Sequence, residues 1–172
     1  AAMLTDPKEV AYHLEKAYDL CKRGRGGPVW LDIPLDVQAA VIQTEELRHY
    51  SSEEEYPQDI RYEERYTKQI IEKITNAKRP VILAGTGIRL GGARELFLKV
   101  IDRLQIPVVT AWNAHDVIWD AHPLYAGRPG TIGTRGGNFI VQNSDLFISL
   151  GCRMNIRQIS YNYDDFAKDA YK

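Results

Sequence analysis

The sequence is poor in cysteine and has no long apolar run, and both absences narrow the possible classes of protein. Its two cysteines, Cys21 and Cys152, stand far apart with no partner motif beside either, which argues against a disulfide framework and a zinc ribbon. No apolar stretch approaches the roughly 20 residues that a membrane helix needs. The first residues lack the basic-then-apolar order of a signal peptide. We therefore expect a cytoplasmic protein with no membrane partner.

An excess of charge of either sign is also lacking, since 22 basic and 23 acidic side chains give a net charge of −1. The sequence has no basic helix and no basic stripe with interleaved aromatic residues, so a nucleic-acid partner is not expected. The acids are concentrated between Thr44 and Glu64, where eight acidic residues stand against two basic ones. A serine pair and Pro57 interrupt this stretch, which has no sustained apolar period. It predicts a solvated acidic linker over 44–64.

The common catalytic signatures are missing as well. The sequence has no GxSxG elbow, no GxxxxGK[ST] loop and no HExxH, and its four histidines have no nucleophile beside them. We expect structural roles for His115 and His122 in the loop that holds them. The sequence thus predicts no catalytic residue and no metal ligand in this chain.

Before the acidic stretch, the pattern predicts one helix and one strand. Asp6, Pro7 and Glu9 fit an N-cap, a first-turn proline and a capping-box glutamate, and apolar residues at helical spacing follow as far as Gly24. The run 28–34 is short, mostly apolar and bounded by glycine and proline, which is typical of a buried parallel strand. One helix and one strand cannot enclose a core, so we interpret them as left over from a neighbouring domain.

After the acidic stretch, helices and strands alternate. The apolar patterns predict helices over 66–77, 96–104, 134–143 and 166–171, and strands over 80–84, 106–111 and 145–150. This alternation predicts an α/β fold, a Rossmann-like three-layer domain over 65–172 whose parallel sheet has helices on both faces. Such a sheet usually continues after its last helix, so we expect the final strand to be missing. An exposed edge of this kind favours a homo-oligomer.

The loops after the strands are the candidate binding positions, because ligands of open parallel sheets lie beyond the carboxyl ends of the strands. Gly85, Thr86 and Gly87 would let backbone amides approach phosphate oxygens, although a turn that needs positive φ explains the glycines equally well. Thr110 and Ala111 stand where an NAD-binding fold usually has an acid, which disfavours plain NAD binding.

The later loops add glycines and arginines. Residues 127–138 hold five glycines, which predicts a close backbone approach to a ligand or to a neighbouring domain. After the last strand, either Arg153 or Arg157 could bind a pyrophosphate in a bidentate manner, and the alternative is an ion pair with a nearby aspartate. Trp112, in the second loop, either stacks on a ring or anchors its loop in the core.

Three segments together resemble one family. Residues 26–38, GGPVWLDIPLDVQ, resemble the GPVxxDIPxDVQ signature that closes the N-terminal domain of thiamine diphosphate-dependent enzymes of the acetolactate synthase type. Residues 79–87 resemble the opening strand of the central domain of these enzymes. The stretches 122–133 and 144–153 resemble that domain's glycine loop and its aDLxxxxGxR strand.

The resemblance implies how the chain is divided. Residues 1–43 would be the C-terminal tail of the pyrimidine-binding N-terminal domain, and 65–172 most of the central domain. The activating glutamate and the GDG…N metal motif would lie outside this chain. The parent enzyme would decarboxylate a 2-oxo acid on thiamine diphosphate, with magnesium, and pass the acyl unit onward. This part alone would be inactive and would contact the flanking domains.

In family members that carry FAD or an adenine nucleotide such as ADP, the ligand lies across the strand ends of the central domain. The resemblance therefore implies a cofactor-binding set, carried over by position: Gly85, Thr86, Gly87, Thr110, Ala111, Gly130, Gly133, Gly151 and Arg153. The sequence departs from the flavin-binding pattern at 154–157, where MNIR replaces a phenylalanine and an Asp-Asp-Arg run. An independent NAD- or nucleotide-binding module and a purely structural spacer are the alternatives.

Overall fold

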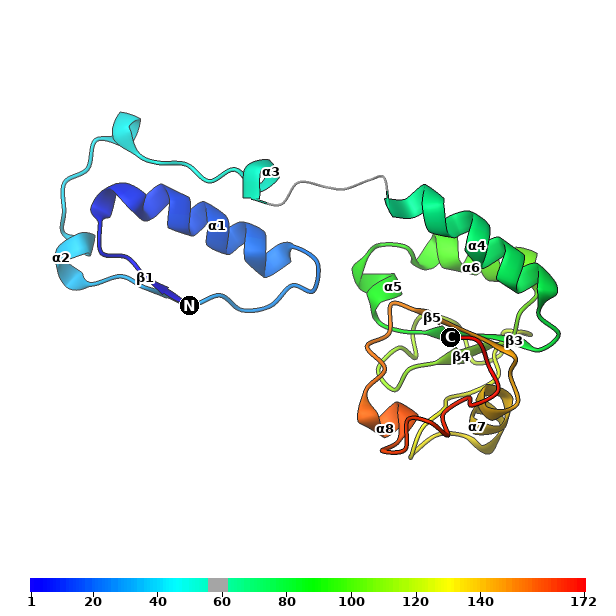
Figure 1. Cartoon of the computed structure of the whole chain (residues 1–172). Helices are drawn as coiled ribbons and strands as arrows, with labels where there is room; N and C mark the ends of the chain where they lie inside the picture. Colours follow the sequence, from blue (N-terminus) through cyan, green and yellow to red (C-terminus); the bar gives the residue numbers. More distant parts are fainter. Residues whose placement is uncertain (56–61) are drawn as a thin grey trace. The chain divides into compact units, whose positions relative to one another are not determined.

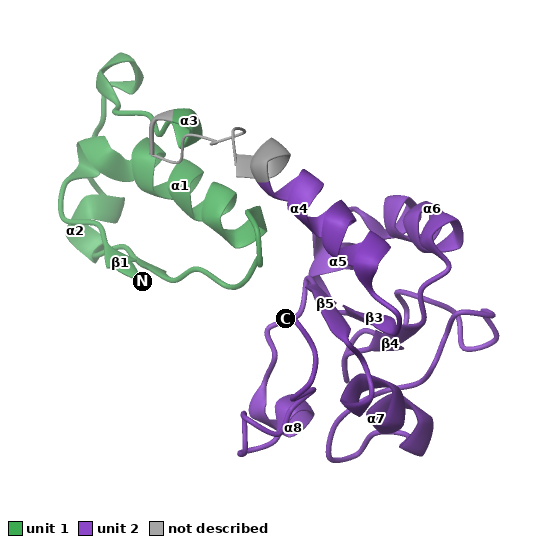
Figure 2. Cartoon of the chain, turned by 45° about the vertical axis from the view of Figure 1, so that its right-hand side comes forward, with its two compact units in different colours: residues 1–62 green, residues 63–172 purple. Residues whose placement is uncertain are grey.

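The structure, a computed structural model, describes residues 1–55 and 62–172 (Figure 1). The chain forms two compact units, residues 1–62 and 63–172, which Figure 2 colours separately. Residues 56–61, which belong to the expected acidic linker, lie outside the described residues.

The first unit combines one long helix with a two-stranded parallel ribbon. Strand β1 (Ala2–Met3) pairs with β2 (Leu31–Asp32). The turn η1 (Pro7–Glu9) is capped by the Asp6 carboxylate and leads into α1 (Val10–Lys22). The short helices α2 (Leu35–Gln38), η2 (Thr44–Glu46) and α3 (Ser52–Glu55) follow. The predicted helix is confirmed, whereas the predicted strand is shorter than expected and pairs with β1, which the sequence pattern did not indicate.

The first unit encloses almost no core. Among residues 1–53, Leu4 is the one buried apolar side chain, fully shielded from solvent. By contrast, Trp30, Leu35 and Val41 are largely exposed. Burying a large apolar side chain stabilises a fold by roughly 1.5–3 kcal/mol, and this unit makes little use of that source of stability.

Polar contacts hold residues 44–50, the start of the expected linker, along α1. The guanidinium of Arg48 lies 3.1 Å from the Glu9 carboxylate. The carboxylate of Glu15 accepts a hydrogen bond from the backbone amide of Tyr50 (2.8 Å) and lies 2.7 Å from Nδ1 of His49. These contacts define a strap, residues 44–50, on the surface of the helix.

The second unit is built on three parallel strands in the order β4–β3–β5. They are β3 (Pro80–Ala84), β4 (Val108–Thr110) and β5 (Leu146–Leu150). Ala84 pairs with Thr110 on one side and with Leu150 on the other, so the three strands end at the same level. The parallel sheet predicted from the alternating pattern is confirmed.

Helices cover both faces of this sheet (Figure 1). On one face lie α4 (Tyr62–Asn76), α5 (Gly87–Leu90) and α6 (Arg94–Leu104), and on the other α7 (Arg135–Gln142) and α8 (Ile156–Ile159). The three-layer α/β prediction is therefore confirmed. Among the described helices, none is long and apolar enough to cross a membrane.

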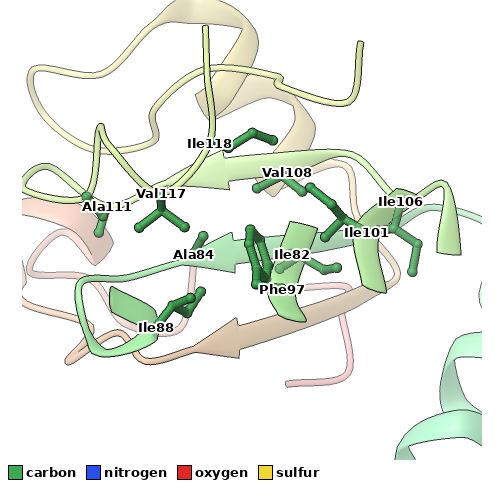
Figure 3. Packing of buried hydrophobic residues seen from close by; sticks show 11 residues of the cluster. Ile82, Ala84, Ile88, Phe97, Ile101, Ile106, Val108, Ala111, Val117 and Ile118 are labelled. Carbon is green, nitrogen blue, oxygen red and sulfur yellow. The ribbon is translucent and has the colours of Figure 1, made fainter. Parts of the chain in front are cut away.

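The core of the second unit follows the alternation of side chains along β3. Ile82 packs with Phe97 and Ile101 of α6 on one face of the sheet (Figure 3). Leu83 points to the opposite face and packs in a second cluster with Val141 of α7. Because successive strand residues alternate between the two faces, one strand serves both cores.

The end of the chain lies along the outer edge of β5. Tyr171 forms a parallel bridge with Leu146, and its carbonyl accepts a hydrogen bond from the amide of Phe147 (2.8 Å). The helix predicted over 166–171 is wrong, since these residues form turns and Ala167 has a φ of +43°. Tertiary packing overrides the local pattern, because Phe166 turns inward and packs edge-on against Phe147, with ring centroids 5.2 Å apart.

Candidate functional site

The carboxyl ends of the three parallel strands meet at one edge of the second unit. There the amide of Gly85 donates to the carbonyl of Leu150 (2.8 Å), and the amide of Ala111 donates to the carbonyl of Ala84 (2.8 Å). These bonds join the loops that follow β3, β4 and β5. The predicted convergence of the loops at one edge is confirmed.

The glycines of the first and fourth loops pack against each other. The amide of Gly87 donates to the carbonyl of Gly151 (2.9 Å). A Cβ at Gly87 would lie 2.7 Å from the Gly151 Cα, and a Cβ at Gly85 would lie 2.5 Å from the Cα of Cys152. Real side chains do not approach backbone so closely. The glycines of this turn are therefore required by the contact between two loops of the protein itself.

The glycine loop after β4 is closed in the same way. Gly130 has a φ of +124°, and a Cβ there would lie 2.8 Å from the carbonyl oxygen of Arg157. The side chain of Asn138 accepts a hydrogen bond from the Gly130 amide (2.8 Å) and donates one to its carbonyl (3.1 Å). The amide of Gly133 donates to the Gly130 carbonyl (3.0 Å). The close backbone approach predicted for this loop is thus made with the protein's own backbone.

This closure bears on phosphate binding. Within the protein, hydrogen bonds already engage the amides of Gly85, Gly87, Gly130, Gly133 and Gly137. An amide that donates to a carbonyl or a side chain has no second proton for a phosphate oxygen. As the described residues stand, the glycine turns are therefore a poor phosphate cradle, and an anionic group at this edge would depend on side chains.

Such side chains line a groove between the second and fourth loops. It is a cavity of about 470 Å³ lined by Trp112, Asn113, Arg153, Asn155, Ile156 and Arg157. Its volume lies within the roughly 300–1,000 Å³ that is usual for small-molecule sites. We call this cavity the tryptophan–arginine groove.

Its charged and aromatic members are available to a ligand. Within residues 1–55 and 62–172, the guanidinium groups of Arg153 and Arg157 form no ion pair and no side-chain hydrogen bond. The alternative of a salt bridge to a nearby aspartate is therefore wrong. Trp112 is 58% exposed, so the alternative that it anchors its loop in the core is wrong as well.

A buried amide, that of Gln158, directly follows Arg157 of the groove in the sequence. The side chain of Gln158 is 6% exposed, and its Oε1 lies 3.5 Å from Sγ of Cys152. Its Nε2 has no hydrogen-bond partner among the described residues, and neither has the buried Oγ1 of Thr110. An unmade hydrogen bond of this kind costs about 1–3 kcal/mol, so such groups usually meet water or a ligand. Gln158 also lines a small cavity of about 20 Å³ together with Trp112 and Arg157.

The second loop holds an acid, but this acid is already paired. The Asp116 carboxylate forms an ion pair with Arg89, and this guanidinium lowers the pKa of Asp116. Nε of Arg94 donates to the Asp116 carbonyl (2.8 Å). The Asp116 carboxylate is thus engaged by Arg89 and is not an unpaired acid beside the second strand.

The two histidines of this region make internal contacts. Nδ1 of His115 lies 2.8 Å from the guanidinium of Arg128. Nδ1 of His122 accepts a hydrogen bond from the amide of Leu124 (3.2 Å), while Nε2 lies 3.2 Å from the Asp102 carboxylate. Both contacts agree with the structural roles expected for these histidines. Across the described residues, no group of three or more His, Cys, Asp or Glu side chains is arranged to hold a metal ion.

The predicted site residues are therefore brought to one edge, but with different roles. The structure places the candidate set of the first, second and fourth loops side by side, and Gly130 reaches this edge through the backbone of Arg157. It adds Asn155 and Gln158, for which the sequence carried no signal, and it places Trp112 and Arg157 in the groove. Trp112 and Arg157 each follow a predicted strand, and this position in the sequence marks them as candidates.

Known proteins provide an independent comparison. Residues 67–172 match the family described as "Thiamine pyrophosphate enzyme, central domain". A probable acetolactate synthase large subunit of Methanococcus aeolicus is 37% identical over 162 residues, which is 90% of this chain and 26% of the relative. The acetolactate synthase isozyme 1 large subunit of Escherichia coli K12 is 34% identical over 152 residues, which is 88% of this chain and 26% of the relative. The acetolactate synthase large subunit of Corynebacterium glutamicum is 33% identical over 168 residues, which is 98% of this chain and 26% of the relative.

This chain spans about a quarter of the length of these curated relatives. The family match covers most of the second unit, including its three parallel strands and the tryptophan–arginine groove. The chain therefore belongs to the thiamine pyrophosphate enzyme family, whose central domain it carries.

Proposed function

We propose that the chain serves as the central domain, with the tail of the preceding domain, of an acetolactate synthase-type enzyme. The parent would decarboxylate a 2-oxo acid on thiamine diphosphate and transfer the acyl unit. The observation that carries this proposal is the family match over residues 67–172, together with 33–37% identity to acetolactate synthase large subunits. Thiamine diphosphate supplies the carbanion chemistry. It and Mg²⁺ would be held mainly outside this chain, which is therefore inactive by itself.

The domain boundaries form part of the proposal. Residues 1–43 are the tail of the pyrimidine-binding domain, 44–64 a linker and 65–172 the central domain. The division into compact units between Tyr62 and Glu63 supports the second boundary. The sparse burial of residues 1–53 supports a segment whose apolar side chains are covered by other parts of its own domain.

The central domain would also hold an adenine nucleotide, either FAD or ADP, at the carboxyl edge of its sheet. The fit is partial. Arg153 of the candidate set forms no ion pair with a described residue and could bind a diphosphate. Nε2 of Gln158, which has no hydrogen-bond partner in the described part of the chain, fits a nearby polar acceptor. The glycine turns do not fit as donors, because their amides are engaged within the protein. The guanidinium groups would therefore bind the diphosphate, while the glycines hold the loops in place.

A homo-oligomer in the cytoplasm completes the proposal. On the outer side of β5, Ser149 and Leu150 are exposed beside a cavity of about 710 Å³ that α4 and Tyr171 also line. Open sheet edges favour pairing with another chain. Sedimentation velocity at increasing concentration tests this arrangement, for which a dimer is expected and a monomer at every concentration is the contrary result.

Two assays test the proposed function. In the first, the 172-residue chain is mixed with pyruvate, thiamine diphosphate and Mg²⁺, and the full-length parent is assayed in parallel. Acetolactate is expected from the parent and not from the chain; formation of acetolactate by the chain alone would contradict the proposal.

In the second assay, thermal unfolding of the chain is followed with FAD, ADP or NAD. A ligand at 100 times its dissociation constant stabilises by about 2.7 kcal/mol. Stabilisation by FAD or ADP is expected. A response to NAD alone would favour an independent NAD module, and no response to any nucleotide would favour a structural spacer.

A further inference from the structure

We infer that Trp112 is the specificity-determining residue of the tryptophan–arginine groove: its indole stacks on the base of an adenosine diphosphate group, whose diphosphate lies between Arg153 and Arg157. The inference rests on the proposed nucleotide binding and identifies the contacts that would make it. FAD and ADP share this adenosine diphosphate group, so the experiment below tests them separately.

Trp112 is unusually exposed for a tryptophan. Tryptophan is highly buried on average, yet this side chain is 58% exposed at the carboxyl edge of the sheet. Trp119 is exposed too, at 73%, but lines none of the cavities that contain Trp112. Trp112 lines the groove, so a flat ring that enters the groove meets the indole. The small cavity of about 20 Å³ that Trp112 also lines has room for about one water molecule. Base–aromatic stacking contributes about 1–3 kcal/mol per base.

The groove carries positive charge. Two guanidinium groups line it, and neither forms an ion pair with any described residue. Asp116, the acid of the loop that carries Trp112, already forms an ion pair with Arg89. Guanidinium groups bind phosphate oxygens through paired N–H donors. The groove thus combines a stacking surface with two free cations, which matches a base that carries a diphosphate.

The glycine turns are closed by hydrogen bonds within the protein. The amides of Gly87 and Gly130 donate within the protein, so they do not compete with the arginines for the diphosphate. The Arg157 carbonyl accepts a hydrogen bond from the Thr131 amide (2.9 Å), which fixes the backbone of this arginine against the glycine loop. The closed turns therefore position the groove and leave ligand contact to side chains.

The experiment uses the whole 172-residue chain and two readouts. The chain has three tryptophans, so Trp30→Phe and Trp119→Phe leave Trp112 as the single fluorophore. ADP is expected to quench its fluorescence, whereas inorganic pyrophosphate, which has no ring, is not. Isothermal titration calorimetry then measures the affinity for ADP, FAD and pyrophosphate in the unsubstituted chain and in Trp112→Ala, Trp112→Phe, Trp119→Ala and Arg157→Met.

The variants are expected to distinguish contacts to the base from contacts to the diphosphate. Trp112→Ala weakens ADP binding about 5- to 150-fold, the equivalent of one lost stacking contact, and leaves pyrophosphate binding unchanged. Trp112→Phe keeps most of the ADP affinity, and Trp119→Ala changes the affinity for neither ADP nor pyrophosphate. Arg157→Met weakens both ADP and pyrophosphate. Circular dichroism melting of each variant confirms that the fold is kept, as expected for exposed side chains.

The contrary outcomes are distinct. ADP binding that is equally tight in Trp112→Ala, or that leaves Trp112 fluorescence unchanged, overturns the inference while the proposed nucleotide binding stands. No binding of ADP or FAD to the unsubstituted chain overturns both. Tighter binding of FAD than of ADP identifies the flavin nucleotide as the source of the adenosine diphosphate group, and the reverse order identifies ADP; either order, with the Trp112 effect, supports the inference.

Discussion

The backbones of Gly87 and Gly151 are in direct contact, with the Gly87 amide donating a 2.9 Å hydrogen bond to the Gly151 carbonyl. Neither position has room for a side chain, since a Cβ on Gly151 would lie 2.9 Å from the Gly87 Cα. The contact joins the loop after the central strand β3 to the loop after its neighbour β5. It fixes the first loop relative to the loop that carries Arg153 and Arg157.

Gly151→Ala should destabilise the second unit. Gly151 has a φ of +61°, and a Cβ there would lie 2.6 Å from the amide nitrogen of Ile88, so the substitution adds crowding to backbone strain. Gly92→Ala is the matched control, because Gly92 has a φ of +66° but open space around it. We expect Gly151→Ala to cost about 1–3 kcal/mol more than Gly92→Ala, the usual penalty of overpacking. Urea unfolding in a Trp30→Phe background, where fluorescence reports only Trp112 and Trp119, measures the difference. An equal loss of unfolding free energy in the two variants would show that the contact between the Gly87 and Gly151 loops is not tight.

Two adjacent glycines of α7 should respond in opposite directions. A Cβ at Gly136 would meet only the Ala126 carbonyl oxygen at 3.6 Å, an ordinary contact, whereas a Cβ at Gly137 would lie 2.6 Å from the backbone of Arg128. Gly136 is the second residue of α7, and Gly136→Ala should stabilise the unit by up to about 0.5 kcal/mol, because the full gain of about 1 kcal/mol belongs to a helix interior. Gly137→Ala should destabilise it by about 1–3 kcal/mol. The same unfolding assay compares the two, and a loss of stability in both variants would be the contrary result.

Much of the second unit could be predicted because its elements carry strong periodic patterns. Strand β3 and helix α6 show the patterns of a buried strand and an amphipathic helix, and both lie where predicted. Strand β1 has two residues and no pattern to detect. The helix expected over 166–171 fails because the burial of Phe166 against Phe147 outweighs local propensity.

The sequence predicts where the candidate site lies better than it predicts which groups would contact a ligand there. A parallel sheet dictates that the loops after its strands meet at one edge, and they do. A sequence does not reveal whether Gly85 and Gly130 make room for a ligand or for neighbouring backbone, because both needs select the same residue. Only the three-dimensional contacts show that the neighbour is backbone. They likewise show that Trp112 is exposed and that Arg157 forms no ion pair with the residues that the structure describes.

Asp145 should make the stability of the second unit depend on pH. Burial raises the pKa of this carboxyl, but hydrogen bonds from the backbone amides of Arg79 and Lys78, both 2.8 Å, outweigh it and lower the pKa below the ordinary value. A carboxylate whose pKa is lowered by folding stabilises fully above its unfolded pKa of about 3.9, and this contribution is lost as pH falls through the folded pKa.

Asp145→Asn should therefore reduce stability at pH 7, because one amide loses its acceptor, and the deficit should shrink below about pH 4. Urea unfolding of both proteins between pH 3 and 7 checks this. Asp164→Asn, on a side chain with no hydrogen-bond partner among the described residues, is the control. A deficit that is the same at every pH would mean that the charge of Asp145 has no role.

Glu15→Gln should loosen the strap of residues 44–50 on α1. The carboxylate binds both the Tyr50 amide and His49, and the Tyr50 amide is the main cause of the lowered pKa of Glu15. Trypsin should then cleave after Arg48 roughly 2- to 10-fold faster, because the strap opens more often. Mass spectrometry follows this cut against the cut after Arg25, which lies in an exposed turn and should not change. Unaltered cleavage after Arg48 would show that Glu15 does not hold the strap.

The location of the nucleotide is tested most directly by NMR of the ¹⁵N-labelled chain titrated with ADP. We expect the indole N–H signal of Trp112 to shift most, together with backbone amide signals of residues 151–158. The amide signals of Arg79 and Asp145, at the opposite end of the sheet, should stay in place, as should those of residues 1–53. Shifts confined to that opposite end or to the first unit, or no shift at millimolar ADP, would contradict a nucleotide site between Trp112 and the two arginines.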